Sequence, residues 1–168
     1  MPKRVHNAGF TLIELVAVIV ILGILAAVSA PKFSDLSRAA KIAALEGIEE
    51  TMRSTARMTK AMAAANGLKV SSSNPGGGQS QYVIQVGGGS SELDWRNLCP
   101  ESRAELGSRL TMVDYINLTG NMQSRVNNRY TFIGFDIPGS APSGQGCYVI
   151  YDSFGFPDCT FTVVDGEC

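Results

Sequence analysis

A run of apolar residues at positions 10–30 constrains this chain more than any other feature, because it carries a single charged side chain, Glu14. The run has 21 residues, and a helix rising about 1.5 Å per residue would make it about 30 Å long, the thickness of a bilayer's hydrocarbon core. We therefore expect residues 10–30 to form a transmembrane helix. Lys3 and Arg4 precede it, so the positive-inside rule places the rest of the chain outside the cytoplasm.

The charge of Glu14 needs an explanation, because an acidic side chain inside a membrane helix costs roughly 2.5–3.5 kcal/mol on insertion scales. Lipid offers the carboxylate no partner, whereas another copy of the chain does. Three simpler interpretations explain less. A cleaved signal peptide would leave Pro31 directly after the cut, a plain single-pass anchor leaves Glu14 without a role, and a buried helix of a soluble protein needs no apolar run of this length.

Residues 9–15 (Gly-Phe-Thr-Leu-Ile-Glu-Leu), after a short leader, resemble the N-terminus of type IV prepilins and the related pseudopilins. The resemblance implies that a prepilin peptidase removes residues 1–9 by cutting after Gly9, and that it methylates Phe10. It also implies that Glu14 pairs with the terminal amine of Phe10 in a neighbouring subunit. Opposite charges attract strongly in a low-dielectric setting, so this contact would register the subunits of a helical filament.

The implied function is structural: a type IV pilus subunit, held in the inner membrane and then polymerised into an extracellular fibre. The implied partners are the prepilin peptidase, the pilus assembly machinery of the inner membrane and other copies of the chain. From Pro31-Lys32-Phe33 onward the chain further resembles the mannose-sensitive haemagglutinin class, whose fibres attach to host or abiotic surfaces. The alternatives are a minor pilin, a type II secretion pseudopilin of a periplasmic pseudopilus, or an anchored binding module that never polymerises.

Residues 31–66 continue the helix in a more polar form, rich in alanine and other strong helix formers. Spacings of three and four predict one largely apolar stripe that faces a folded domain. The stripe consists of Leu45, Ile48, Met52, Thr55, Thr59 and Met62. We expect the helix to end at Asn66-Gly67. Gly23 and Pro31 weaken it, and the family resemblance implies that residues 23–31 loosen in the filament.

Residues 67–168 form the globular part, which is large enough for one core. Glycine and serine clusters at 71–78 and 87–91 predict loops, and neither cluster is followed by the lysine of a phosphate-binding loop. Pro100 introduces a short helix expected at 101–110. Aromatic and β-branched residues predict strands at four places, namely 82–86, 130–137, 148–151 and 160–164.

Short links between successive strands favour an antiparallel sheet. The predicted fold is therefore α+β: a long N-terminal helical spine, whose first half spans the membrane and whose outer half packs against an antiparallel sheet of about four strands.

Four cysteines lie in the part of the chain expected outside the cytoplasm: Cys99, Cys147, Cys159 and Cys168. An even count in an oxidising compartment predicts two disulfides, and the close cysteine pairs of a zinc site are absent from the sequence. If 148–151 and 160–164 form a hairpin, its open end brings Cys147 near Cys168 and leaves Cys99 for Cys159. The competing arrangement pairs Cys99 with Cys147 and Cys159 with Cys168. Either one bounds the C-terminal region, which resembles the disulfide-bounded surface region of type IV pilins.

The sequence of the mature chain shows no spaced constellation of nucleophile and base, although serine, threonine and acidic residues remain. Its single histidine, His6, belongs to the leader, so the commonest general base and metal ligand is lost on cleavage. The acids near the C-terminus lack EF-hand spacing, and we expect neither a metal nor a cofactor. Loss of Lys3 and Arg4 moves the net side-chain charge from −1 to −3, which argues against strong nonspecific binding to nucleic acid. We expect no enzymatic activity.

Overall fold

The computed structural model of the chain describes residues 11–168, with the backbone alone at residues 28–35 and at residue 78. Contacts divide the chain into two compact units, with the boundary after Ala39. One long helix, α1 (Leu12–Ala65), contributes residues to both units. The other elements all belong to the second unit: η1 (Gly77–Gln79), β1 (Val83–Val86), β2 (Gly89–Glu92), η2 (Met112–Tyr115), β3 (Gln123–Val126), β4 (Tyr130–Asp136), β5 (Cys147–Asp152) and β6 (Thr160–Val164).

The helix α1 is unbroken at Gly23 and at Pro31, the two positions where the sequence predicts a weak helix. Strong helix formers surround both positions, and a proline in a helix removes one backbone hydrogen bond rather than several. The predicted helix is therefore confirmed from Leu12 to Ala65. The loosening expected over residues 23–31 concerns the assembled filament and stays a prediction.

The end of α1 at Asn66-Gly67 is also confirmed. Gly67 has a positive φ of 74°, a conformation that glycine adopts without a steric penalty. The N–H of Gly67 donates to the carbonyl of Ala64 (2.9 Å), and the N–H of Leu68 donates to the carbonyl of Ala63 (3.0 Å). These two hydrogen bonds form a Schellman motif, which satisfies carbonyls that the last turn of a helix leaves without partners.

In the second unit, the last part of α1 packs on the β-strands through the predicted apolar stripe. All six stripe residues are buried or half-buried: Leu45, Ile48, Met52, Thr55, Thr59 and Met62. Two small residues that the sequence analysis did not name, Ala56 and Ala63, are buried in the same stripe. Because alanine has the shortest apolar side chain, these positions let the strands and loops approach the helix closely.

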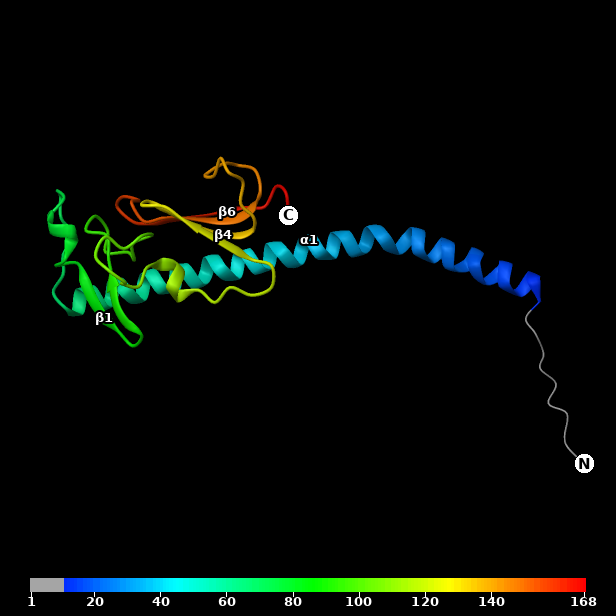
Figure 1. Cartoon of the computed structure of the whole chain (residues 1–168), viewed down its shortest axis with the longest axis horizontal. Coiled ribbons are helices and arrows are strands. Elements are labelled where there is room, and N and C mark those ends of the chain that lie inside the picture. The colour runs from blue at the N-terminus through cyan, green and yellow to red at the C-terminus, as the bar shows by residue number, and fades with distance from the viewer. Residues whose placement is uncertain (1–10) are drawn as a thin grey trace, which may run out of the picture. The chain divides into compact units, whose positions relative to one another are not determined.

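The main sheet is antiparallel, with the strand order β3-β4-β5-β6. Figure 1 shows β4 and β6 lying along the cyan part of α1. Ile133, Val149 and Tyr151 of the sheet share one core with Leu45 and Met52 of α1. The predicted α+β fold, with the outer part of the helix packed on an antiparallel sheet, is confirmed, and three of the predicted strands correspond to β4, β5 and β6.

The prediction of the remaining strands was wrong in two respects. Residues 82–86 do form a strand, β1, but it pairs with β2 in a separate two-stranded sheet. The fourth strand of the main sheet is instead β3, a polar edge strand. In addition, β2 lies where the glycine-rich segment 87–91 predicts a loop. A tight turn at 87–88 folds the chain back, and pairing with β1 overrides the low strand propensity of glycine and serine.

The short helix expected at residues 101–110 is absent from the described structure, where this segment is a series of bends. The reason is that its backbone groups bond to the preceding hairpin. The N–H of Glu101 donates to the carbonyl of Glu92 (2.9 Å). The side-chain carboxylate of Glu92 accepts bonds from the N–H groups of Glu105 (3.1 Å) and Leu106 (3.3 Å). These long-range bonds replace those that a helix would form within the segment.

The face of the sheet opposite α1 has its own small core, formed by Phe132, Tyr148 and Val164. Gly134 of β4 lies opposite Tyr148 of β5, next to an irregularity in the strand register. A Cβ at residue 134 would lie 2.3 Å from the carbonyl oxygen of Cys147 and 2.4 Å from the Cα of Tyr148. Any side chain at this position would therefore push β4 and β5 apart.

We predict that Gly134→Ala lowers the free energy of unfolding by at least about 1–3 kcal/mol, because the added methyl group overlaps backbone atoms that cannot rotate away. Urea unfolding of the full chain in detergent, followed by the fluorescence of Trp95, measures this. Gly139→Ala is the matched control, since a Cβ there meets no atom within 4 Å. Equal midpoints for the two variants would contradict the prediction.

Candidate functional site

The first turn of α1 is organised by Thr11 and Glu14. The backbone N–H of Thr11 donates to Glu14 Oε2 (2.8 Å), and the Thr11 hydroxyl donates to the same oxygen (2.7 Å). In return, the N–H of Glu14 donates to Thr11 Oγ1 (3.3 Å). This reciprocal arrangement is a capping box, which satisfies N–H groups that a helix leaves without partners at its start.

The capping box gives Glu14 a partner within its own chain. The isolated charge in the sequence predicts that another copy of the chain supplies the partner of this carboxylate, whereas Thr11 of the same chain already supplies two donors. A carboxylate has about four acceptor sites, so it has capacity for further bonds. The contact between Glu14 and the amine of Phe10 stays a prediction, because residues 1–10 lie outside the described structure, including the leader, Gly9 and Phe10.

Beyond the cap, the side chains of residues 12–27 are exposed on all sides of the helix. Leu12 is 80 % exposed and Ile24 is 61 % exposed. Apolar surface of this extent on a protein marks a region that another molecule covers.

The membrane span predicted at residues 10–30 is not shown by the structure. Within residues 11–168, no helix has a stretch that is both long enough and apolar enough to cross a membrane. Phe10 and the side chains of residues 28–30, which belong to the predicted span, lie outside the description.

All four cysteines form disulfides. Cys147 bonds to Cys168, with their Cα atoms 4.8 Å apart, and Cys99 bonds to Cys159, with their Cα atoms 6.3 Å apart. This is the pairing that the hairpin argument favours over the competing one, and β5 and β6 do form that hairpin. Because each bond closes a loop in the unfolded chain, each is expected to stabilise the fold by about 3–4 kcal/mol.

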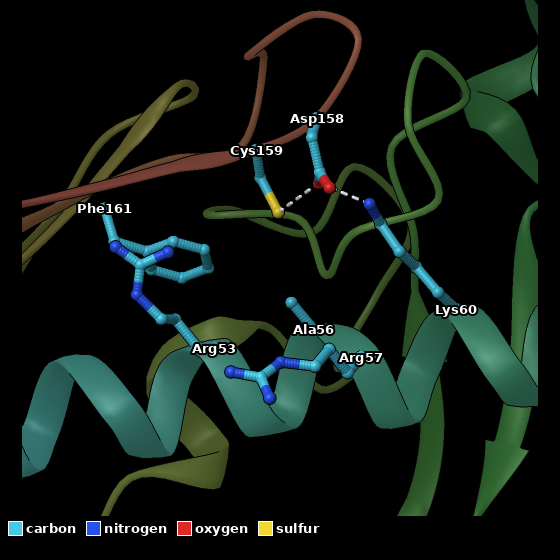
Figure 2. Close-up of a pocket in the computed structure, with 7 residues that line it drawn as sticks. All are labelled: Arg53, Ala56, Arg57, Lys60, Asp158, Cys159 and Phe161. Atoms are coloured by element: carbon cyan, nitrogen blue, oxygen red, sulfur yellow. Dashed lines mark hydrogen bonds and ion pairs between the residues drawn. The ribbon is translucent and has the colours of Figure 1, made fainter.

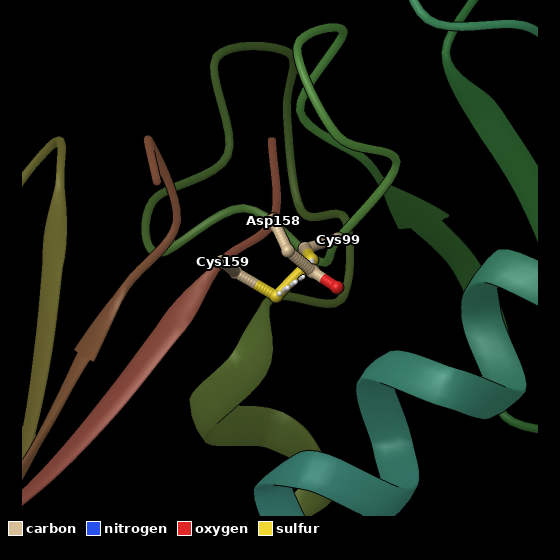
Figure 3. A group of neighbouring side chains, drawn as sticks. All are labelled: Cys99, Asp158 and Cys159. Atoms are coloured by element: carbon tan, nitrogen blue, oxygen red, sulfur yellow. Dashed lines mark hydrogen bonds between the residues drawn. A yellow bond between two sulfur atoms is a disulfide. The ribbon is translucent and has the colours of Figure 1, made fainter. Parts of the chain in front are cut away.

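Asp158 lies beside one of these disulfides, as Figure 3 shows. Its Oδ1 is 3.4 Å from the sulfur of Cys99 and 3.4 Å from that of Cys159. In the part of the chain that the structure describes, these three residues are the one group with the spacing of metal ligands. Sulfurs that share a disulfide cannot act as thiolate ligands, so the group is a structural crosslink with a neighbouring carboxylate.

A cavity of about 300 Å³ lies between α1 and the start of β6 (Figure 2). Three cations of α1 line it, Arg53, Arg57 and Lys60. Each has a carboxylate partner: Arg53 pairs with Glu49, Arg57 Nη2 lies 3.7 Å from Glu50, and Lys60 pairs with Asp158. Partly exposed ion pairs of this kind contribute little stability. The pair of Lys60 and Asp158 also joins the connection between β5 and β6 to the helix, whereas the other two pairs lie within α1.

The second unit also buries three acids that the sequence analysis overlooked: Glu92, Asp94 and Glu101 are at most 1 % exposed. Glu92 and Asp94 are two residues apart in an extended segment and so share a face. The bridge between Leu93 and Pro100 brings Glu101 opposite them. The sequence does hold one signal for this cluster. Residues 92–94 alternate acid, leucine and acid, which is the spacing that places two polar side chains on one face of a strand.

These three acids do not all keep a charge. Asp94 Oδ2 accepts a bond from Arg96 Nη1 (2.6 Å), and Glu92 accepts the backbone bonds described above. Glu101 has no such cation. Burial, with the added repulsion of Asp94 and Glu92, raises the pKa of Glu101 to about 9. At neutral pH Glu101 is therefore protonated and hydrogen-bonds to Asp94 as a donor.

Comparison with known proteins bears on the N-terminal segment. Residues 4–30 match the family model described as the prokaryotic N-terminal methylation motif. The chain carries this methylation motif. This match supports a type IV pilin-like prepilin or pseudopilin, which is a structural rather than an enzymatic family. The match does not distinguish the mannose-sensitive haemagglutinin class from other members. No curated protein matches the chain, and no solved structure matches it.

We predict that the second unit loses stability as the pH rises from 6 to 9. The native state holds a proton on Glu101 that the unfolded state releases above its ordinary pKa of 4.5. Each pH unit in this window therefore favours unfolding by up to about 1.4 kcal/mol. Thermal unfolding of the full chain across the pH series measures the slope.

Glu101→Gln should remove most of this pH dependence, because the amide can still donate to Asp94 but does not titrate. Glu46→Gln is the control, since Glu46 is exposed and is not among the charges that raise the pKa of Glu101, so it should leave the slope unchanged. The assignment to Glu101 fails if both variants keep the slope of the parent chain.

Proposed function

We propose that this chain is the structural subunit of a type IV pilus. The observation that carries the proposal is the methylation motif at residues 4–30, which leads into an exposed apolar helix that holds one acid at its start. Exposed apolar surface on every side of a helix is stable when other chains or lipid surround it. Polymerisation through this helix provides such cover.

The proposed sequence of events begins in the inner membrane. Prepilin peptidase cuts after Gly9, Phe10 is methylated, and the assembly machinery transfers the subunit from lipid to the growing filament. The resemblance to the mannose-sensitive haemagglutinin class supports an extracellular fibre that attaches to host or abiotic surfaces. The globular unit, crosslinked by two disulfides, would form the outside of that fibre.

Mass spectrometry on fibres sheared from the native cell surface tests this proposal. An abundant chain that begins with methylated Phe10 supports a major pilin. Processed chain that is found in the membrane and periplasm but not in sheared fibres would replace the proposal with a minor pilin or a type II secretion pseudopilin.

The first variant to test is Glu14→Ala. We expect it to reduce the yield of sheared fibres at least about tenfold, because a buried charge contact worth more than about 1.4 kcal/mol is lost at each subunit junction. Glu46→Ala, which removes an exposed acid from the same helix, should leave the yield unchanged. Undiminished fibres from the Glu14 variant, at equal cellular abundance, would remove its role in assembly.

The second variant, Gly9→Val, tests processing. A branched side chain at the cleavage position should keep the leader attached, so intact-mass measurement should find a chain that retains residues 1–9. Val5→Ala, elsewhere in the predicted leader, is the control and should be processed normally. A Gly9→Val chain that still begins at Phe10 would show that the cleavage site is misplaced.

A further inference from the structure

A second cavity, of about 750 Å³, lies elsewhere in the globular unit and has a different character from the one in Figure 2. Three aromatic rings line it, Trp95, Phe154 and Phe156, together with Arg96 and the short segment 70–72. Its volume is within the range of about 300–1,000 Å³ typical of small-molecule sites. Such sites combine mostly apolar walls with a few polar groups that fix the ligand.

Hydrogen bonds hold both walls of this cavity in place. The N–H of Ser71 donates to the carbonyl of Trp95 (2.9 Å), which fixes the segment 70–72. The buried amide of Asn97 donates from Nδ2 to the carbonyls of Ser153 and Gly155, each at 2.7 Å. These bonds fix the connection that carries Phe154 and Phe156. The cavity is therefore preformed, which reduces the entropy lost on binding.

Arg96 has an unusual position in the cavity. Its guanidinium carbon is 4.1 Å from the ring centre of Trp95 and 4.2 Å from that of Phe154. The side chain of Asp94, which is fully buried, accepts hydrogen bonds from Nη1 of Arg96 and from the backbone N–H of Arg96. Because two rings lie close to the guanidinium carbon and Asp94 holds Nη1, a ligand would bond to the remaining N–H groups at the edge of the guanidinium. Edge donors of this kind match a carboxylate.

Phe156 supplies the open surface of the cavity. It is 81 % exposed, the highest value among the large apolar side chains that the structure describes, and Val70 beside it in the lining is 57 % exposed. An aromatic ring left in water in the wall of a preformed cavity marks a binding surface. Arg96 is the one charged residue in the described lining. Asp94 holds its Nη1, so the cavity offers the remaining N–H groups of the guanidinium next to an apolar ring.

We propose that this cavity binds a ligand that combines a flat aromatic ring with a carboxylate. The ring stacks on Phe156, and the carboxylate accepts hydrogen bonds from the edge of Arg96. Asp94 stays behind Arg96 and holds it for the incoming anion. The site is independent of the assembly role proposed above, since it lies wholly in the globular unit.

Trp95 is the single tryptophan of the chain and lines the cavity, so its fluorescence reports on binding directly. The full chain in detergent is titrated with sodium benzoate, with correction for ligand absorption. We expect a saturable change with a dissociation constant of about 1 mM, a usual value for a ligand with so few atoms. Benzyl alcohol, which keeps the ring but lacks the charge, should bind at least about tenfold more weakly.

Cyclohexanecarboxylate, which keeps the charge but lacks the aromatic ring, should bind at least about threefold more weakly than benzoate. Phe156→Ala should weaken benzoate binding about tenfold, and its exposed position keeps the fold intact. Leu118→Ala removes another exposed apolar side chain, outside the cavity, and should bind benzoate like the parent chain.

Three results would each overturn the proposal. The first is a change in fluorescence that does not saturate, and the second is binding of benzyl alcohol as tight as that of benzoate. The third is benzoate binding that survives Phe156→Ala unchanged. Self-association of the parent chain that Phe156→Ala abolishes, without any binding of benzoate, would assign the same surface to contacts between copies.

Discussion

Contact between the stripe of α1 and the strands determines where the other parts of the globular unit lie. Leu45, Met52 and Ala56 form one core with the main sheet, and Ala63 joins a second core with the two-stranded sheet. One helix therefore organises two sheets that share no strand pairing. The Cys99–Cys159 disulfide, the ion pair of Lys60 with Asp158 and the walls of the second cavity follow from this arrangement, because the β5–β6 connection is fixed against the helix and the 94–99 loop.

The two parts of α1 differ in what they require from their surroundings. Residues beyond Ala39 satisfy their apolar stripe within the chain. Residues 12–27 expose apolar side chains around the whole helix, with the Thr11–Glu14 cap at the start. A helix that is apolar on every side is stable when it is buried. The first part thus needs an environment that a single chain does not provide, and this need agrees with the methylation motif found there.

The sequence predicted the elements that depend on local pattern. The stripe at three and four residue spacing, the Asn66-Gly67 stop and the three aromatic strands are each encoded within a short window, and the structure has all of them. The sequence predicted poorly those segments whose conformation depends on residues distant in the chain. Glu92 holds residues 105 and 106 by its carboxylate, which prevents the expected helix. Strand β2 depends on its partner β1 rather than on its own glycine and serine residues.

The difference between local and distant contacts also explains which site residues could be recognised from the sequence. Glu14 stood out because a single charge in an apolar run is visible in the sequence, yet the contribution of Thr11 to its environment required geometry. The arrangement of Trp95 and Phe154 around Arg96 was not visible, since the two rings are distant in the sequence and hydrogen bonds from Asn97 hold the connection that carries Phe154. An isolated charge in the sequence thus indicates where a partner is needed, whereas a cavity built from separate loops becomes apparent after the chain has folded. Function that depends on assembly is for this reason easier to infer from this sequence than function that depends on a ligand.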